Sequence, residues 1–203
     1  MAKWPAYGRC KSRLAKDIGR ENALSIQKKM LMHTISVSRF LEKKKFIELS
    51  IATTGIGSIR SHKWSKELGI KHFNLQGQGT LGERMRRQIL KNKRSRFKNK
   101  CQDYLIIGTD LPNLCHLDLL EAISKVKVND IIFGPSKDGG YWLIGISNKL
   151  ASTNLFLPFI DITWSSDDVL QKTLDNLINQ KLKIDFLNCK VDIDTIKDLE
   201  ESA

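Results

Sequence analysis

The sequence predicts an α/β fold with a mostly parallel sheet, in one domain spanning residues 1–203. Short apolar stretches typical of buried strands alternate with longer stretches of helical periodicity, as in parallel sheets covered by helices. No repeat, low-complexity linker or change of composition divides the chain. A chain of 203 residues can also build one substantial core, since a domain of this size buries about 70% of its unfolded surface.

Helices are predicted where apolar residues recur every three or four positions. The predicted helices cover residues 21–41, 59–68, 80–93, 116–126, 165–177 and 195–201. We expect Asp167 and Asp168 in the first turn of the fifth helix, where the helix dipole favours acidic side chains. Thr195 and Asp198 have the spacing of a capping box at the start of the sixth.

Strands are predicted from short apolar or alternating runs. They cover residues 47–53, 71–75, 104–108, 131–133, 141–146 and 183–187. A βα unit should open with a strand, but residues 1–19 hold no apolar run, so the first strand is predicted to be missing or truncated. We expect the native product to start upstream of Met1, adding about 5–8 residues. The alternative is a stub at residues 1–3 that the sheet tolerates.

Asp110 follows the apolar run Tyr104–Ile107, and Pro112 then stops further strand pairing. A carboxylate therefore lies where a buried strand leaves the core, and ligands of open α/β sheets bind outside such strand ends. A carboxylate in this position can hold a hard divalent cation, and the cation can in turn hold phosphates. The alternative is that Asp110 only organises its turn.

The composition narrows the class of protein. No apolar run is long enough for a membrane span or a secretion signal, and the four cysteines lack CxxC spacing, so we expect a cytoplasmic protein without a zinc or redox site. The formal net charge is +12, with much of the excess in residues 84–100. A solvated helix end and loop explains this run, and nucleic-acid binding is the alternative.

Glycine-rich segments offer further ligand-binding candidates. Basic residues surround Gly8 just before a helix and can neutralise a polyphosphate, although a basic loop is more often merely solvated. Residues 77–82 match GxGxxG, which here indicates a turn more than a dinucleotide site. Residues 134–142 join two strands and combine glycines with Asp138, Tyr141 and Trp142, which suits a sugar as well as a plain turn.

Near the C-terminus, Asp192 and Asp194 lie on one face if the segment is extended. Asp194 is also positioned to cap the last helix, and the two roles can coexist.

Together these motifs, in order, resemble one family. They are Trp4-Pro5-Ala6-x-Gly8-Arg9-x-Lys11-Ser12-Arg13-Leu14, Leu81-Gly82-Glu83-Arg84-Met85, Ile107-Gly108-Thr109-Asp110-x-Pro112, Gly134-Pro135-x-x-Asp138-Gly139-Gly140-Tyr141 and Asp192-Ile193-Asp194-Thr195. The chain resembles the glycosyltransferase-A-fold proteins of arsenosugar biosynthesis, also described as radical-SAM/selenodomain-associated transferases, which are relatives of the 2-phospholactate guanylyltransferases. The strand that these families place before the Trp-Pro loop is absent.

The resemblance implies a nucleotide-diphospho-sugar transferase-like three-layer sandwich and a metal-dependent enzyme. It implies that Lys11 and Arg13 meet phosphates and that Asp110, Asp192 and Asp194 hold Mg²⁺ or Mn²⁺. The expected nucleotide-binding residues of the matched motifs are Gly8, Lys11, Arg13, Gly82, Arg84, Thr109, Gly139 and Gly140.

Two reaction classes remain open. A glycosyltransferase would move a sugar from a nucleotide-sugar donor to a small-molecule acceptor, with Asp138 as the candidate catalytic base. A nucleotidyltransferase of the 2-phospholactate guanylyltransferase type would need no base, because its attacking phosphate is already anionic. A basic nucleic-acid-binding protein is the non-enzymatic alternative, but it leaves the three carboxylates without a role.

The basic run is predicted to be a solvated face. Replacing Lys93, Arg94, Arg96 and Lys98 by Gln should leave turnover within a few-fold and weaken any binding to DNA or RNA, with a flatter salt dependence. Steady-state assays and salt titrations of DNA binding check this. A loss of turnover by orders of magnitude in a folded variant would place the run in the site.

Overall fold

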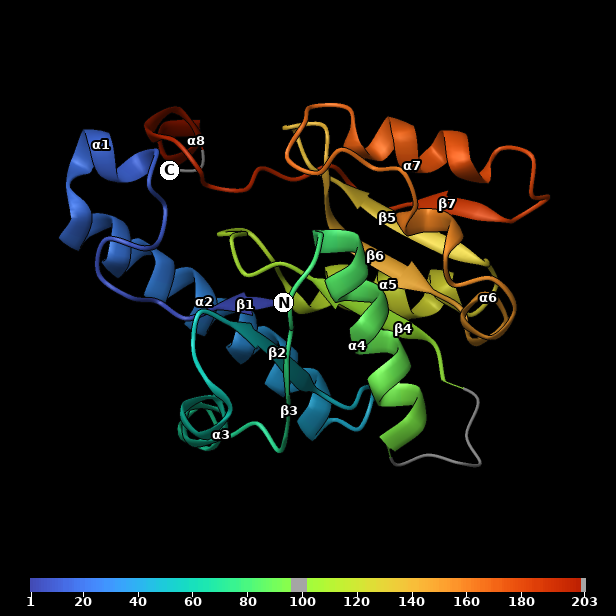
Figure 1. Ribbon diagram of the computed structural model, residues 1–203, viewed down its shortest axis with the longest axis horizontal. Coiled ribbons are helices and arrows are strands. Elements are labelled where there is room, and N and C mark those ends of the chain that lie inside the picture. The colour runs from blue at the N-terminus through green and yellow to red at the C-terminus, as the bar shows by residue number, and fades with distance from the viewer. Residues whose placement is uncertain (96–101, 202–203) are drawn as a thin grey trace. The chain divides into compact units, whose positions relative to one another are not determined.

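The computed structural model describes residues 1–95 and 102–201, which form two compact units. The first unit comprises Met1–Leu75, Gly108–His116 and Val191–Ala203, and the second comprises Gln76–Ile107 and Leu117–Lys190. Strands and helices alternate in both, so the predicted α/β class is confirmed (Figure 1). The assignment of residues 1–203 to one domain stays a prediction.

The first unit contains a parallel sheet in the order β1-β2-β3. Its strands are β1 (Ala2–Lys3), β2 (Ser50–Thr54) and β3 (His72–Leu75), and its helices are α1 (Leu14–Ile18), α2 (Arg20–Lys43), α3 (Ser58–Glu67) and α8 (Ile196–Glu201). Ala2 and Lys3 pair with Thr53 and Thr54, and the Trp4 N–H donates to the Thr54 carbonyl at 2.9 Å. The first strand is therefore a two-residue stub, as the truncated alternative predicted.

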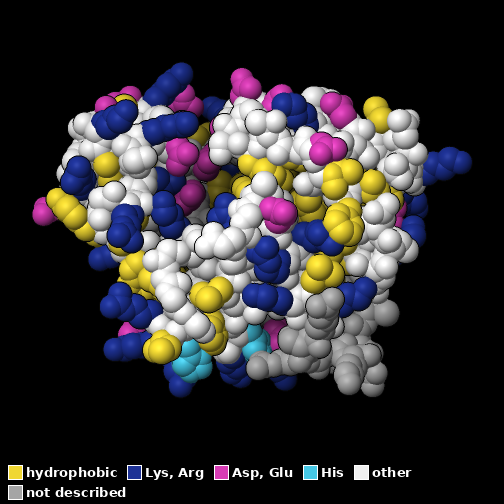
Figure 2. Space-filling model, in the orientation of Figure 1, with side chains coloured by type: hydrophobic (Ala, Val, Ile, Leu, Met, Phe, Trp, Pro, Cys, Tyr) yellow, Lys and Arg dark blue, Asp and Glu magenta, His cyan; other side chains and the backbone are white. Residues whose placement is uncertain are grey.

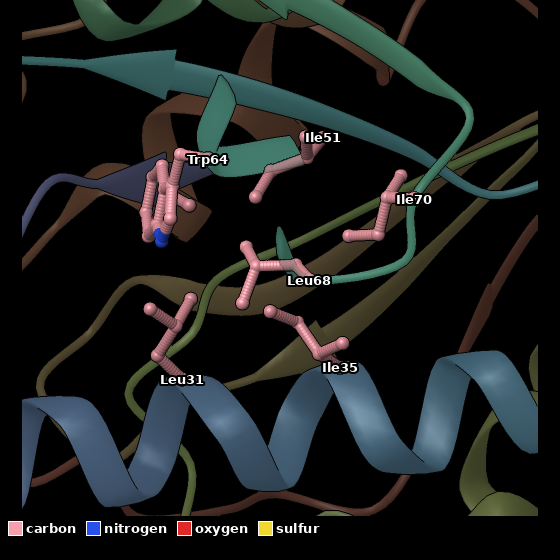
Figure 3. Packing of buried hydrophobic residues seen from close by; sticks show 7 residues of the cluster. Leu31, Ile35, Ile51, Trp64, Leu68 and Ile70 are labelled. Atoms are coloured by element: carbon pink, nitrogen blue, oxygen red, sulfur yellow. The ribbon is translucent and has the colours of Figure 1, made fainter. Parts of the chain in front are cut away.

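Helix α2 packs its apolar face on this sheet. Leu31 and Ile35 are neighbours on one helical face and point toward Ile51 of β2, with Leu68 and Ile70 closing the cluster (Figure 3). The spacing of the buried positions along α2 alternates between one, three and four residues, as a helix with one buried face requires. This packing fixes α2 on the parallel sheet.

A second small core joins the two ends of the first unit. Leu14 of α1, Met30 of α2 and Ile193 are buried together, and Ile196 and Leu199 of α8 pack against them. The segment before α8 is therefore held against α1 and α2, as the neighbouring α1 and α8 ribbons show (Figure 1).

The second unit contains a mixed sheet in the order β4-β6-β5-β7. Its strands are β4 (Tyr104–Ile107), β5 (Ile131–Pro135), β6 (Tyr141–Ile146) and β7 (Ile184–Phe186), and its helices are α4 (Leu81–Ser95), α5 (His116–Val126), α6 (Asn148–Thr153), the 3-10 helix η1 (Leu157–Phe159) and α7 (Val169–Leu177). Strand β6 runs antiparallel to both of its neighbours, while β5 and β7 are parallel. The short loop between β5 and β6 is thus a hairpin connection.

The predicted start of the helix at 165–177 was wrong. Helix α7 begins at Val169, because Ser165 has a left-handed φ of 74° and cannot continue a helix. The Ser166 hydroxyl instead lies within hydrogen-bonding distance of two acceptors, the Thr163 carbonyl and Asp168 Oδ1, and these contacts form a local turn. Asp168 is the residue that precedes the helix, and Asp167 lies outside it.

Charged side chains are spread over the surface. Lys and Arg side chains are interspersed with Asp and Glu over the visible face (Figure 2). Residues 96–100 of the predicted basic run lie outside the described residues, so only its helical part, within α4, is placed. Among the helices of residues 1–95 and 102–201, none is both long and apolar enough to cross a bilayer.

The core of the first unit predicts a clear contrast between two neighbours on α2. Leu31 is 2% exposed and Met32 is 51% exposed. Leu31→Ala should lower the free energy of unfolding by about 2–5 kcal/mol, because it removes buried methyl groups and leaves a cavity. Met32→Ala, the matched control, should change it by about 0.5 kcal/mol or less. Urea denaturation measures both, and equal losses would contradict the packing described.

Candidate functional site

Asp110 lies just beyond the end of β4, at the start of a turn that buried apolar side chains hold in place. Leu111 and Leu114 follow it and are almost fully buried, so the turn is fixed to the first unit by its apolar side chains. The Asp110 carboxylate itself is 40% exposed. The predicted strand before Asp110 is confirmed, but its four residues are only partly buried, so the expectation that this strand is buried was wrong.

Lys11 reaches this carboxylate from the N-terminal loop. Its Nζ lies 3.2 Å from Asp110 Oδ2 and 2.8 Å from Asp194 Oδ1. The Lys11 side chain is only 3% exposed, whereas the two carboxylates are 40% and 50% exposed. The ammonium therefore lies beneath two acidic groups that both present part of their surface to solvent.

The charge and the backbone of Lys11 are both unusual. Burial alone would lower the pKa of its ammonium, but the Asp110 and Asp194 carboxylates outweigh burial and raise that pKa above its ordinary value. Lys11 is thus a charged cation. Its φ of 47° lies in the left-handed region, which residues other than glycine adopt at a cost that the surrounding contacts must offset.

Gln27 of α2 completes the support of Asp110. Its Nε2 donates to Asp110 Oδ1 at 3.1 Å, and the side chain is buried. The Ile193 N–H donates to the Asp110 backbone carbonyl at 3.1 Å. Sequence reasoning missed Gln27, although a polar residue on the otherwise apolar face of α2, one turn from Ala23 and Leu31, is a signal that could have identified it.

At the start of α8, the side chain of Asp198 accepts the backbone hydrogen bonds, so the Asp194 carboxylate can pair with Lys11. Asp198 Oδ2 accepts from the backbone N–H groups of Asp194 and Thr195, at 3.0 and 2.7 Å. The Asp198 N–H in turn donates to Thr195 Oγ1 at 3.4 Å. The predicted capping box is confirmed, and Thr195 rather than Asp194 supplies the capping side chain.

Two of the three predicted metal ligands, Asp110 and Asp194, lie close together because both contact the Lys11 ammonium. Asp192 is partly buried two residues before Asp194, and Ile193 between them packs into the core. Within residues 1–95 and 102–201, no group of three or more His, Cys, Asp or Glu side chains is arranged to hold a metal ion. The oxygen pair nevertheless suits Mg²⁺, which proteins commonly hold with one or two carboxylates plus substrate phosphates. The ammonium of Lys11 marks this pair as a place for a cation.

The other candidates in the N-terminal loop are exposed. Gly8 has a φ of 69°, which permits the tight turn there, and Arg9 and Arg13 extend into solvent. Thr109, beside Asp110, is instead buried. Lys11 was predicted to meet phosphates, but here its ammonium pairs with carboxylates, so Arg9 and Arg13 are the exposed cations of this loop.

The GxGxxG segment belongs to the second unit, where packing explains its last glycine, Gly82. A Cβ on Gly82 would lie 2.5 Å from the Trp164 ring, so no larger residue fits. Arg84 donates from Nε to the Thr80 carbonyl and from an Nη to Gln76 Oε1, both at 3.3 Å. The turn interpretation of this segment is supported by these contacts.

The loop between β5 and β6 is organised by Asp138. Its Oδ1 accepts from the Ser136 hydroxyl at 2.7 Å and from the Gly140 N–H at 3.0 Å, while the residue is exposed. Gly139 has a φ of 84°, and a Cβ there would collide with the Asp167 carbonyl. Asp138 therefore has a turn-forming role, and Gly139 is required by packing.

Comparison with solved structures supports a transferase fold. The chain matches the crystal structure of an inferred nucleotide-diphospho-sugar transferase from Desulfovibrio desulfuricans G20, with a TM-score of 0.80 and 26% identity. The match covers 98% of this chain and 81% of the other. No curated protein matches the chain significantly. The predicted nucleotide-diphospho-sugar transferase-like fold is confirmed by this likeness.

A family model gives the remaining comparison. Residues 39–166, well over half of the chain, match the model of DUF2064, which is described as an uncharacterized protein conserved in bacteria. The matched region includes Asp110, the GxGxxG segment and the Asp138 loop, but not Lys11 or Asp194. The chain therefore belongs to the DUF2064 family and has the fold of a nucleotide-diphospho-sugar transferase.

Proposed function

We propose that the protein is a metal-dependent glycosyltransferase that moves a sugar from a nucleotide-diphosphate donor to a small-molecule acceptor. The observation that carries this proposal is the pairing of Asp110 and Asp194 around one cation at the end of β4. Ligands of open α/β sheets bind at this type of position. The likeness to an inferred nucleotide-diphospho-sugar transferase supports the same class of donor.

Asp110 and Asp194 are the residues that would hold Mg²⁺ or Mn²⁺, with Asp192 as the predicted third ligand. When bound, such a metal would neutralise negative charge on the donor diphosphate and on the leaving group. Gln27 and the Ile193 N–H hold Asp110 in position, so its carboxylate does not have to reorganise when a ligand arrives. Arg9 and Arg13 provide exposed cations for phosphate.

The acceptor and the base belong to the finer part of the proposal. The resemblance to the glycosyltransferases of arsenosugar biosynthesis favours a small hydroxylated acceptor. Asp138 is the proposed base, because a carboxylate that two donors hold in one orientation can accept a proton from an acceptor hydroxyl.

A thermal-shift panel of nucleotide sugars and free nucleotides, each with Mn²⁺ and with EDTA, tests the donor class. A true donor should stabilise the protein only with Mn²⁺, by about 2.7 kcal/mol at a hundredfold excess over its dissociation constant. Release of nucleoside diphosphate would then identify sugar transfer, and release of pyrophosphate from a nucleoside triphosphate would identify nucleotidyl transfer. The absence of any stabilising nucleotide would contradict the proposal.

Asp110→Asn should keep the fold but lose metal-dependent donor binding. The change is nearly isosteric and keeps an acceptor for Gln27, while it removes the negative charge that a metal needs. We expect turnover to fall about a hundredfold or more, since metal contributions amount to several kcal/mol. Calorimetry with Mn²⁺ and the donor checks this. Asp17→Asn, on the exposed side of α1, is the charge-matched control, and equal donor affinity in both variants would refute the metal assignment.

Two replacements separate the catalytic and structural roles of Asp138. Asn keeps an oxygen for Ser136 and Gly140 but is not basic, whereas Ala removes both properties. If Asp138 is the base, Asp138→Asn should lower kcat about 10²–10⁴-fold with unchanged melting temperature and donor affinity. Wild-type turnover in Asp138→Asn, together with a lower melting temperature in Asp138→Ala, would show a turn-forming role alone.

A further inference from the structure

The environment of Lys11 differs from that of an ordinary surface ion pair. Its ammonium is almost fully buried and contacts two carboxylates at 3.2 and 2.8 Å, while those carboxylates remain about half exposed. The ammonium is therefore shielded from solvent, and the two carboxylates are the part of this cluster that solvent reaches.

This arrangement opposes the binding of a free divalent cation. One ammonium already neutralises half of the charge of Asp110 and Asp194, and like charges at this separation repel strongly in a partly buried site. A divalent ion that arrived alone would have to share the carboxylates with Lys11 or displace it. A displaced ammonium would need another anion, because a buried charge without a partner is costly.

A polyphosphate would supply that anion. Lysine has a flexible four-carbon stem and binds phosphate as a point charge, so its ammonium can change partners without a large backbone movement. Lys11 also lies in a loop whose exposed residues include Arg9 and Arg13, and its left-handed φ of 47° shows that surrounding contacts hold this residue in place at a conformational cost.

We propose that Lys11 is a resident cation that keeps free divalent metal ions off Asp110 and Asp194 until a nucleotide polyphosphate binds and takes over its ammonium. This inference rests on the proposed transferase function. Metal and polyphosphate then bind cooperatively, because each removes an obstacle to the other and such coupling is reciprocal. The protein would thus select the metal–nucleotide complex over either component alone.

The test uses Mn²⁺ alone, with free Mn²⁺ measured by electron paramagnetic resonance. Lys11→Met keeps the length of the side chain and removes its charge. This variant should bind Mn²⁺ about tenfold or more tightly than the wild-type protein, because the competing charge is gone. Lys11→Arg, which keeps the charge, should bind it as weakly as the wild type. Lys16→Met, on the exposed face of α1, controls for the loss of one positive charge elsewhere.

A second arm uses inorganic pyrophosphate in metal-free buffer. Lys11→Met should bind pyrophosphate about tenfold more weakly than Lys16→Met if the ammonium moves to phosphate. Equal affinities would overturn the exchange. Unchanged or weaker Mn²⁺ binding by Lys11→Met would overturn the competition.

Loss of folding does not obscure the result. If Lys11→Met unfolds without metal, Mn²⁺ should restore its fold, since a ligand of the native state stabilises it by mass action. A failure of Mn²⁺ to do so would contradict the proposal. These measurements use Mn²⁺ and pyrophosphate and need no nucleotide sugar. A failed nucleotide-sugar panel would therefore refute the transferase function without changing the results for the Lys11 variants.

Discussion

The buried ammonium of Lys11 is the constraint on which the candidate site depends. Its two partners come from distant parts of the chain, the turn after β4 and the segment before α8. An unpaired charge in that position would cost several kcal/mol, so the fold must deliver both carboxylates to the same point. The pair of carboxylates is equally dependent on the ammonium, because two acidic groups brought this close repel each other without it.

Apolar packing and backbone hydrogen bonds provide the precision that this pairing needs. Ile193 is buried against Leu14 and Met30, which fixes the segment that carries Asp194, and its N–H bonds the Asp110 carbonyl. Gln27 donates to Asp110 from the same face of α2 that packs on the parallel sheet. The first unit therefore holds the two acidic groups and Lys11 in a defined geometry.

Glycine-rich motifs illustrate how one residue pattern can serve two purposes. Gly82 is small because Trp164 lies against it, and Gly139 is required by a left-handed φ and by the Asp167 carbonyl. Asp138 accepts two hydrogen bonds within its own loop. Glycine and aspartate favour tight turns, and the same residues together with aromatic side chains also suit contacts with a sugar. The turn-forming role of these positions is therefore compatible with the proposed role in binding.

The sequence by itself determined the α/β class, the helices with strong periodicity and the position of Asp110 after a strand, because these depend on local patterns of apolar and polar residues. Only the tertiary structure decided that Lys11 pairs with Asp110 and Asp194 and that Gln27 supports Asp110. These features arise between segments up to 183 residues apart, and no local pattern specifies which distant groups meet. The start of α7 was missed for a related reason, since the left-handed backbone of Ser165 cannot be recognised from residue type alone.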